Sequence, residues 1–315
     1  MRSVVVPVLT ALVLAGTSAC SAFSGDEGTA DDDGVRVATG FYPLQFVAER
    51  VGGDLVTVDN LTVPGKEPHD LELTIQETAA VAESDLVVFE HGFQPAVDEA
   101  VETSAEGAVL DASEAVELRP VEEPEGGEGH VEEEGHEGED DHGDLDPHFW
   151  QDPVLLADLG DAVADELAEL DPDNADTFAA NAADLRAALE SLDADFAGGL
   201  EDCERDTVVV SHDAFGYLEK YGLHFEAIAG LSPDAEPTPA DLGRLQQLIE
   251  DDGITTVFGE RLAPPALVDT LARDAGVTTA VLDPIEGLTD ETEGEDYLTL
   301  MTQNLDALRQ ANGCP

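Results

Sequence analysis

Three histidines and one aspartate occupy positions from which their side chains could bind a metal ion together. They lie in four short polar segments, at His69, His148, His212 and Asp283. Three imidazoles and one carboxylate form a donor set that suits tetrahedral zinc. Proline adjoins three of the four residues and would stiffen the backbone that presents them. Taken singly, a loop histidine is usually a surface residue and Asp-Pro usually a turn. The prediction of a metal site therefore depends on the joint placement of the four residues in the fold.

The elements that must position these residues alternate between strands and helices. Apolar runs predict strands at residues 35–38, 56–59, 86–89, 108–110, 207–210, 225–229, 256–258 and 279–282. Periodic patterns predict helices at residues 44–51, 74–83, 96–103, 154–170, 175–200, 242–250, 266–275 and 297–310. This alternation indicates α/β architecture with mostly parallel sheets. Three of the four candidate ligands follow a strand, at the sheet edge where such folds bind ligands.

The order of the elements predicts two lobes with one connection. Residues 35–170 form an N-terminal lobe, residues 171–200 a long linking helix, and residues 201–315 a C-terminal lobe. A single helical connection limits how far two lobes can hinge. Each lobe carries two of the candidate ligands, so both are expected to contribute to one metal-binding site between them.

The N-terminus is typical of an exported protein. Residues 1–19 combine a positive start, an apolar core and a run of small residues, which is a signal-peptide pattern. Cys20 follows directly, as in a bacterial lipoprotein whose cysteine is acylated after processing. The alternative is an unmodified cysteine in an ordinary signal peptide. Residues 20–34 are acidic and rich in small residues, and we expect them to be a flexible tether.

Two further cysteines, Cys203 and Cys314, remain after Cys20 is set aside. Exported proteins generally oxidise such pairs. We therefore expect a disulfide between the start of the C-terminal lobe and the last helix.

The net charge of −60 excludes one class of partner. Nucleic-acid binding requires clusters of Lys and Arg, and this chain has only 12 such residues against 72 acidic ones. A negative field concentrates cations, which would help a cation receptor, although an acidic surface is also typical of proteins from salt-rich habitats.

A separate segment, residues 121–146, interrupts the α/β pattern. Its 26 residues include 13 acidic residues, six glycines and the three histidines His130, His136 and His142. Such a composition cannot bury enough apolar surface to fold, so we expect a disordered insertion. It could supply auxiliary metal sites or be only a solvated acidic spacer.

Several motifs then resemble one known family, the zinc and manganese solute-binding proteins of bacterial ABC transporters. The resemblance covers about residues 35 to 312. The matching segments are Pro68-His69-Asp70, the stretch 146–153 (DPHFWQDP), the stretch 211–218 (SHDAFGYL), the stretch 228–237 (IAGLSPDAEP), the stretch 257–260 (VFGE) and Leu282-Asp283-Pro284.

The resemblance implies two (β/α)4-type lobes, a rigid linking helix and a buried metal between the lobes. It also implies that His69, His148 and His212 are ligands, with Asp283 or water as the fourth. Manganese-type members resemble this chain but carry Glu in place of His212, and imidazole suits zinc. The implied function is high-affinity extracytoplasmic capture of Zn²⁺ by a lipid-anchored monomer. That monomer delivers the ion to an ABC permease and its ATPase, with no catalytic step.

Three other functions remain open from the sequence. One is a manganese or iron receptor of the same family. Another is a zinc hydrolase, which would need an open coordination position and a general base. No His-Glu-x-x-His pattern is present in the sequence. The third is a surface adhesin or zinc buffer that works without a transporter.

Overall fold

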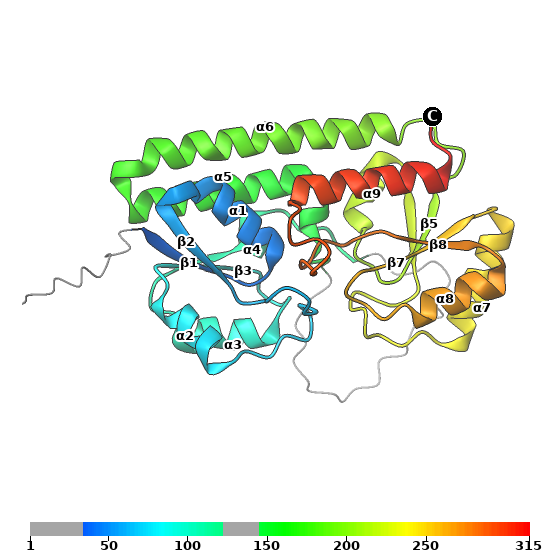
Figure 1. Ribbon diagram of the computed structural model, residues 1–315, viewed down its shortest axis with the longest axis horizontal. Helices are drawn as coiled ribbons and strands as arrows, with labels where there is room; N and C mark the ends of the chain where they lie inside the picture. Colours follow the sequence, from blue (N-terminus) through cyan, green and yellow to red (C-terminus); the bar gives the residue numbers. More distant parts are fainter. Residues whose placement is uncertain (1–33, 122–144) are drawn as a thin grey trace, which may run out of the picture. The chain divides into compact units, whose positions relative to one another are not determined.

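The computed structural model describes residues 34–121 and 145–315 (Figure 1). The first part contains β1 (Val35–Thr39), α1 (Tyr42–Gly52), the 3₁₀ helix η1 (Gly53–Leu55), β2 (Val56–Asn60), α2 (Ile75–Glu83), β3 (Leu86–Phe89), α3 (Pro95–Ser104), β4 (Ala108–Asp111) and α4 (Ala112–Ala115). Then come η2 (Phe149–Gln151), α5 (Pro153–Leu170), η3 (Pro172–Asn174) and α6 (Ala175–Gly199). The chain continues with β5 (Thr207–Val210), η4 (Gly216–Tyr221), β6 (His224–Ala227), α7 (Pro239–Asp251), β7 (Thr256–Gly259), α8 (Ala266–Ala275), β8 (Thr278–Val281) and α9 (Tyr297–Asn312).

The first sheet has the strand order β2-β1-β3-β4, and every pair is parallel. Because side chains alternate along a strand, β3 serves two cores. Leu86 and Val88 join the cluster that includes α1 and α5, whereas Val87 and Phe89 join the cluster with α2 and α3. Burial on both faces explains the continuous apolar run of this strand.

The second sheet repeats this plan with the order β6-β5-β7-β8, again all parallel. Val209 and Val257 pack with α7 and α8, whereas Val208 and Val210 belong to the larger cluster that also contains residues of α9. Two sheets of four parallel strands confirm the predicted α/β class with two lobes. All eight predicted strands are present, with some ends displaced by one or two residues.

Helices α5, α6 and α9 form a layer that spans both sheets (Figure 1). The 25 residues of α6 correspond to about 37 Å of helix. This helix packs against α1 and α5 on one side of the molecule and against α9 on the other. Its buried residues belong to a single apolar cluster that reaches both sheets. Pro172 begins the separate turn η3 and is not part of α6.

Local signals in the sequence fix where helices begin next to the functional loops. Thr74 and Glu77 form a reciprocal capping box that starts α2 just after the His69 segment. Asp152 caps α5 by accepting a hydrogen bond from Val154, and Pro153 occupies the first helical position. These caps end the loops that carry His69 and His148 at defined points.

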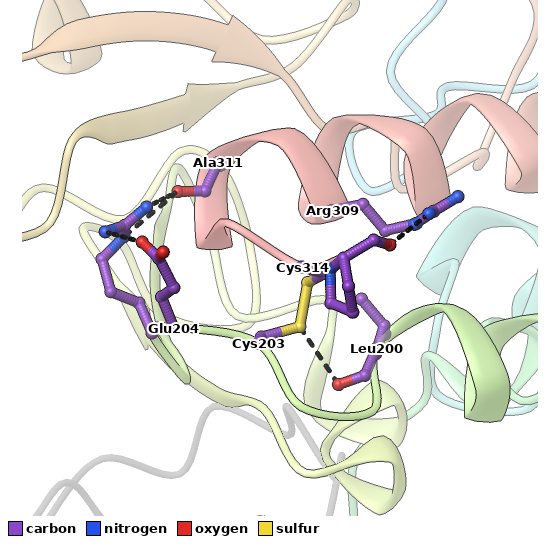
Figure 2. Close-up of a disulfide and its surroundings, with 8 residues drawn as sticks. Leu200, Cys203, Glu204, Arg309, Ala311 and Cys314 are labelled. Atoms are coloured by element: carbon purple, nitrogen blue, oxygen red, sulfur yellow. Dashed lines mark hydrogen bonds and ion pairs between the residues drawn. A yellow bond between two sulfur atoms is a disulfide. The ribbon is translucent and has the colours of Figure 1, made fainter.

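The predicted disulfide between Cys203 and Cys314 is present (Figure 2). It ties the loop that follows α6 to the residues that follow α9. Arg205 adds hydrogen bonds to the carbonyl of Ala311 beside it, at 3.1 and 3.3 Å. The C-terminus is thereby attached to the start of the second lobe.

No helix in the described residues is long and apolar enough to span a membrane.

Candidate metal centre

Four side chains from four separate loops converge on one point between the two sheets. His69 lies in the loop after β2, His148 immediately precedes η2, and His212 follows β5. Glu286 lies in the loop after β8. The ligand atoms of these four residues all lie within 4.8 Å of one another. Each lobe contributes two of the four.

The spacing within this group fits a small cation. Oε1 of Glu286 lies 3.5 Å from Nε2 of His69, 3.4 Å from that of His148 and 3.3 Å from that of His212. A tetrahedron whose vertices lie about 2.0–2.1 Å from its centre, as zinc ligands do, has edges of about 3.3–3.4 Å. The three separations between Glu286 and the histidines are therefore close to the edge length of a tetrahedral zinc shell.

Among the residues that the structure describes, the same atoms are buried and have no hydrogen-bond partner. This holds for Nε2 of His69, His148 and His212 and for both carboxylate oxygens of Glu286. Buried polar atoms are normally satisfied, so an orphaned cluster of this kind requires an explanation. Three imidazole nitrogens and a carboxylate oxygen that face one another are accounted for by a divalent cation among them.

Two of the histidines are oriented by buried carboxylates. Nδ1 of His148 lies 2.9 Å from Oδ1 of Asp146, and Nδ1 of His212 lies 2.6 Å from Oε1 of Glu260. A proton held between each Nδ1 and its carboxylate leaves the Nε2 lone pair directed at the centre. Ser211 also donates a hydrogen bond to Glu260.

His69 is held differently. Its side chain is 11% exposed, whereas those of His148 and His212 are fully buried. Within the described residues its only acidic neighbour at ion-pair distance is Glu286. Its backbone N–H donates to Oε1 of Glu67 at 3.2 Å, and its ring meets that of Phe93 edge-on, with centroids 4.5 Å apart.

Charge coupling at the centre favours protons when no metal is bound. Burial lowers the pKa of His212, but the carboxylates of Glu260 and Glu286 outweigh burial and raise it to about 10. Burial raises the pKa of Glu286, but the three surrounding histidines hold it well below its usual range. The carboxylates therefore favour a proton on His212, and a metal ion that binds there must displace it.

The predicted fourth ligand, Asp283, is not part of the group. Its Oδ2 pairs with Nε of Arg261 at 2.9 Å, and its Oδ1 accepts a hydrogen bond from the backbone N–H of Ile285 at 2.9 Å. Asp283 therefore shapes the turn, and the carboxylate three residues further on, Glu286, reaches the centre. The sequence did contain a signal for Glu286, because it is a second acidic residue in the same loop as Asp283.

The segment that carries His148 also holds the loop of Glu286. Nε1 of Trp150 donates to the carbonyl of Pro284 at 2.8 Å, and the side-chain amide of Gln151 donates to the same oxygen. Tyr297 at the start of α9 donates to the carbonyl of Trp150. Residues from one lobe thus position a candidate ligand that belongs to the other.

The remaining predicted residues cannot be placed. His130, His136, His142 and Cys20 lie outside the described residues. Their roles in auxiliary metal binding and lipidation stay predictions.

The fold and this centre together define a two-lobed α/β protein with a candidate metal site between its lobes. The chain matches the family model ZnuA, zinc-uptake complex component A, periplasmic, over residues 37–311. The chain belongs to this family, which confirms the resemblance found in its motifs.

Three similar proteins illustrate the relationship. The zinc-binding lipoprotein AdcA of Streptococcus pneumoniae R6 is 36% identical over 286 residues, which cover 89% of this chain and 56% of AdcA. The high-affinity zinc uptake system protein ZnuA of Bacillus subtilis is 34% identical over 296 residues, covering 91% of each chain. The crystal structure of the Zn(II)-bound ZnuA-like domain of Streptococcus pneumoniae AdcA matches with a TM-score of 0.72 at 34% identity, covering 89% of this chain and 99% of that one. This chain thus spans about half the length of AdcA.

Proposed function

We propose that this protein is an extracytoplasmic receptor that captures Zn²⁺ as cargo and delivers it to an ABC transporter for uptake. The observation that carries the proposal is the set of five orphaned buried atoms on His69, His148, His212 and Glu286. Their separations suit tetrahedral zinc. The names of the similar proteins, which describe zinc binding and zinc uptake, support the same cargo.

The donor set favours zinc over manganese. Imidazole nitrogens suit zinc, whereas manganese prefers shells made of carboxylate, carbonyl and water oxygens. Here three of the four ligand atoms are imidazole nitrogens. Asp146 and Glu260 strengthen this preference because they hold the Nδ1 protons and make each Nε2 a better donor.

A receptor without a catalytic step accounts for the shell better than a hydrolase does. A catalytic zinc site keeps one position open for water, whereas four protein ligands fill a tetrahedral shell. The family model is described as a zinc-uptake complex component and one relative as a high-affinity zinc uptake system protein, which supports the same conclusion. We accordingly propose an ABC permease and its ATPase as partners, and a monomer as the working form.

The proposed attachment to the membrane rests on the sequence. We propose that residues 1–19 are removed and that Cys20 becomes the acylated first residue. The description of AdcA as a lipoprotein supports this. Replacement Cys20→Ala should move the protein from the membrane fraction to the soluble fraction of fractionated cells. A variant that stays in the membrane fraction would argue against the anchor.

The cargo is tested by metal analysis of the purified protein and by diffraction. We expect one tightly bound zinc per chain, with an anomalous peak at the zinc edge surrounded by the three histidines and Glu286. Competition against a chelator should show tighter binding of zinc than of manganese. A preference for manganese, or a peak elsewhere in the chain, would overturn the assignment.

A further inference from the structure

Asp146, whose carboxylate orients His148, is itself held through its backbone carbonyl by a residue of the other lobe. Tyr217 lies in η4 of the C-terminal half, and its hydroxyl donates to the carbonyl of Asp146 at 2.7 Å. The same hydroxyl accepts a hydrogen bond from the backbone N–H of Arg119 at 3.0 Å. The backbone N–H of Asp146 donates to the carbonyl of Arg119 at 2.8 Å. Tyr217 therefore closes a ring of three hydrogen bonds with two residues of the N-terminal half.

The side chains around this ring of hydrogen bonds also lie where the two lobes contact each other. Arg119 pairs with Glu219 of η4 at 3.0 Å, and its guanidinium lies 5.8 Å from the centre of the Tyr217 ring. A Cβ added to Gly216 would lie 2.7 Å from Nη1 of Arg119 and 3.0 Å from Oδ2 of Asp146. The absence of a side chain at Gly216 thus leaves the space in which these two groups approach the other lobe.

Within the part of the chain that the structure describes, the contacts that orient Nδ1 of the second histidine come from its own half. His212, Glu260 and the Ser211 hydroxyl that contacts Glu260 all belong to the C-terminal half. Asp146, in contrast, is buried and accepts two hydrogen bonds from His148, through Nδ1 and through the backbone N–H at 3.0 Å. Any displacement of the Asp146 backbone changes the direction in which His148 presents Nε2.

From this arrangement we propose that Tyr217 is a positioning residue for the metal centre, which acts from the opposite lobe through Asp146 on His148. The proposal rests on the proposed function, because it assumes that His148 binds zinc. It gives the centre a sensor of lobe contact: His148 is correctly aimed only while η4 lies against the segment that contains Arg119 and Asp146.

The test is a double-mutant cycle on the full chain. Tyr217→Phe removes only the hydroxyl and should weaken zinc binding about tenfold, the lower end of the loss typical of outer-shell partners. Asp146→Asn should weaken it about 10- to 100-fold. Because Tyr217 acts through Asp146, the double variant should bind no more weakly than Asp146→Asn alone.

Tyr221→Phe is the matched control. Tyr221 lies in the same short helix and its hydroxyl also donates a hydrogen bond, to the carboxylate of Asp193 at 2.7 Å, but this pair is outside the metal centre. We expect its zinc affinity to stay within about twofold of wild type. Melting of each variant in the presence of chelator reports any loss of fold. The absorption spectrum of bound Co²⁺ reports the ligand geometry, and we expect it to change in Tyr217→Phe only.

Two results would overturn this inference and leave the proposed function unaffected. One is zinc affinity in Tyr217→Phe within about twofold of wild type, and the other is full additivity of the two losses in the double variant. Absence of zinc binding by the wild-type protein would instead overturn the proposed function, and the inference with it.

Discussion

His69 and His212 reach the same point from opposite lobes, but their surroundings differ. His212 is fully buried and its Nδ1 lies 2.6 Å from a buried carboxylate. His69 is partly exposed and stands on the loop between β2 and α2, where Gly65 donates to the carbonyl of Leu288 across the lobe boundary at 2.7 Å. Loops with few buried contacts open more readily than cores. The comparison suggests that His212 is a preformed ligand and His69 the one most easily withdrawn.

Replacement His212→Ala should cause the largest loss of zinc affinity among the changes that test this comparison. Zinc sites of four ligands are worth roughly 12 kcal/mol, or about 3 kcal/mol per ligand, so we expect at least a hundredfold loss of zinc affinity. The substitution also leaves Glu260 buried beside Ser211 without its imidazole partner. Competition titration against a chelator measures the loss.

His224→Ala is the control for this substitution. His224 is exposed and pairs with Glu219 and Glu226 on the surface, away from the centre. Its replacement should leave zinc affinity unchanged. Unchanged affinity in His212→Ala would remove His212 from the ligand set and leave the preference for zinc over manganese without support.

A change of pH should produce the next largest change in zinc affinity. The adjacent carboxylates outweigh burial and raise the pKa of His212 to about 10, so the metal-free centre keeps this proton throughout the neutral range. The proton stabilises the metal-free fold fully below about pH 6.5, the ordinary value for histidine, and this stabilisation is lost as pH rises towards 10. Zinc requires the neutral ring, so its affinity should rise about tenfold per pH unit between pH 7 and 9.

Calorimetry in buffers of different ionisation enthalpy counts the protons released on binding. We expect at least one proton per zinc at pH 8, because Asp146 and Glu286 outweigh burial and also raise the pKa of His148. An ordinary histidine would release almost none. A pH dependence confined to the region below about 7 would mean that His212 titrates as an unperturbed histidine. The coupling with Glu260 and Glu286 would then be weaker than the geometry indicates.

Replacement His69→Ala should have a smaller effect than His212→Ala. Because no carboxylate contacts Nδ1 of the His69 ring within the described residues and the side chain is partly exposed, water can take its place at low cost. We expect about a tenfold loss of affinity, expressed mainly as faster zinc dissociation in stopped-flow chelation. His91→Ala, at another exposed histidine of the same lobe, is the control. Equal losses in His69→Ala and His212→Ala would eliminate the distinction between the two ligands.

The sequence predicts most of the fold because its local signals agree. The apolar run Leu86–Phe89 is typical of an internal strand, and the Thr74–Glu77 capping box marks the start of α2. The three histidines could be predicted because the loops that carry them match the motifs of one family. Asp146 could have been found as well, since it stands two residues before His148.

Two parts of the centre depend on tertiary structure that the sequence does not reveal. The choice between Asp283 and Glu286 is made by a turn in which Ile285 adopts a φ of 61°, a conformation that β-branched residues rarely take. No periodicity or turn rule predicts it. Glu260 lies 48 residues from His212, and only the pairing of β5 with β7 brings the two together.

The smallest expected effect is that of deleting Glu122–Asp144. The four converging residues all lie outside this segment. The residues that flank it are already adjacent, since Pro120 and Leu145 form an antiparallel bridge and the backbone N–H of Asp146 donates to the carbonyl of Arg119. A short connection can therefore replace the segment without moving Asp146 or His148. We expect unchanged high-affinity binding of one zinc, with loss only of weaker additional binding by His130, His136 and His142, measured by titration over a wide zinc range. Loss of the tight site would mean that the deleted segment supplies a ligand, and the comparison between His69 and His212 would have to include it.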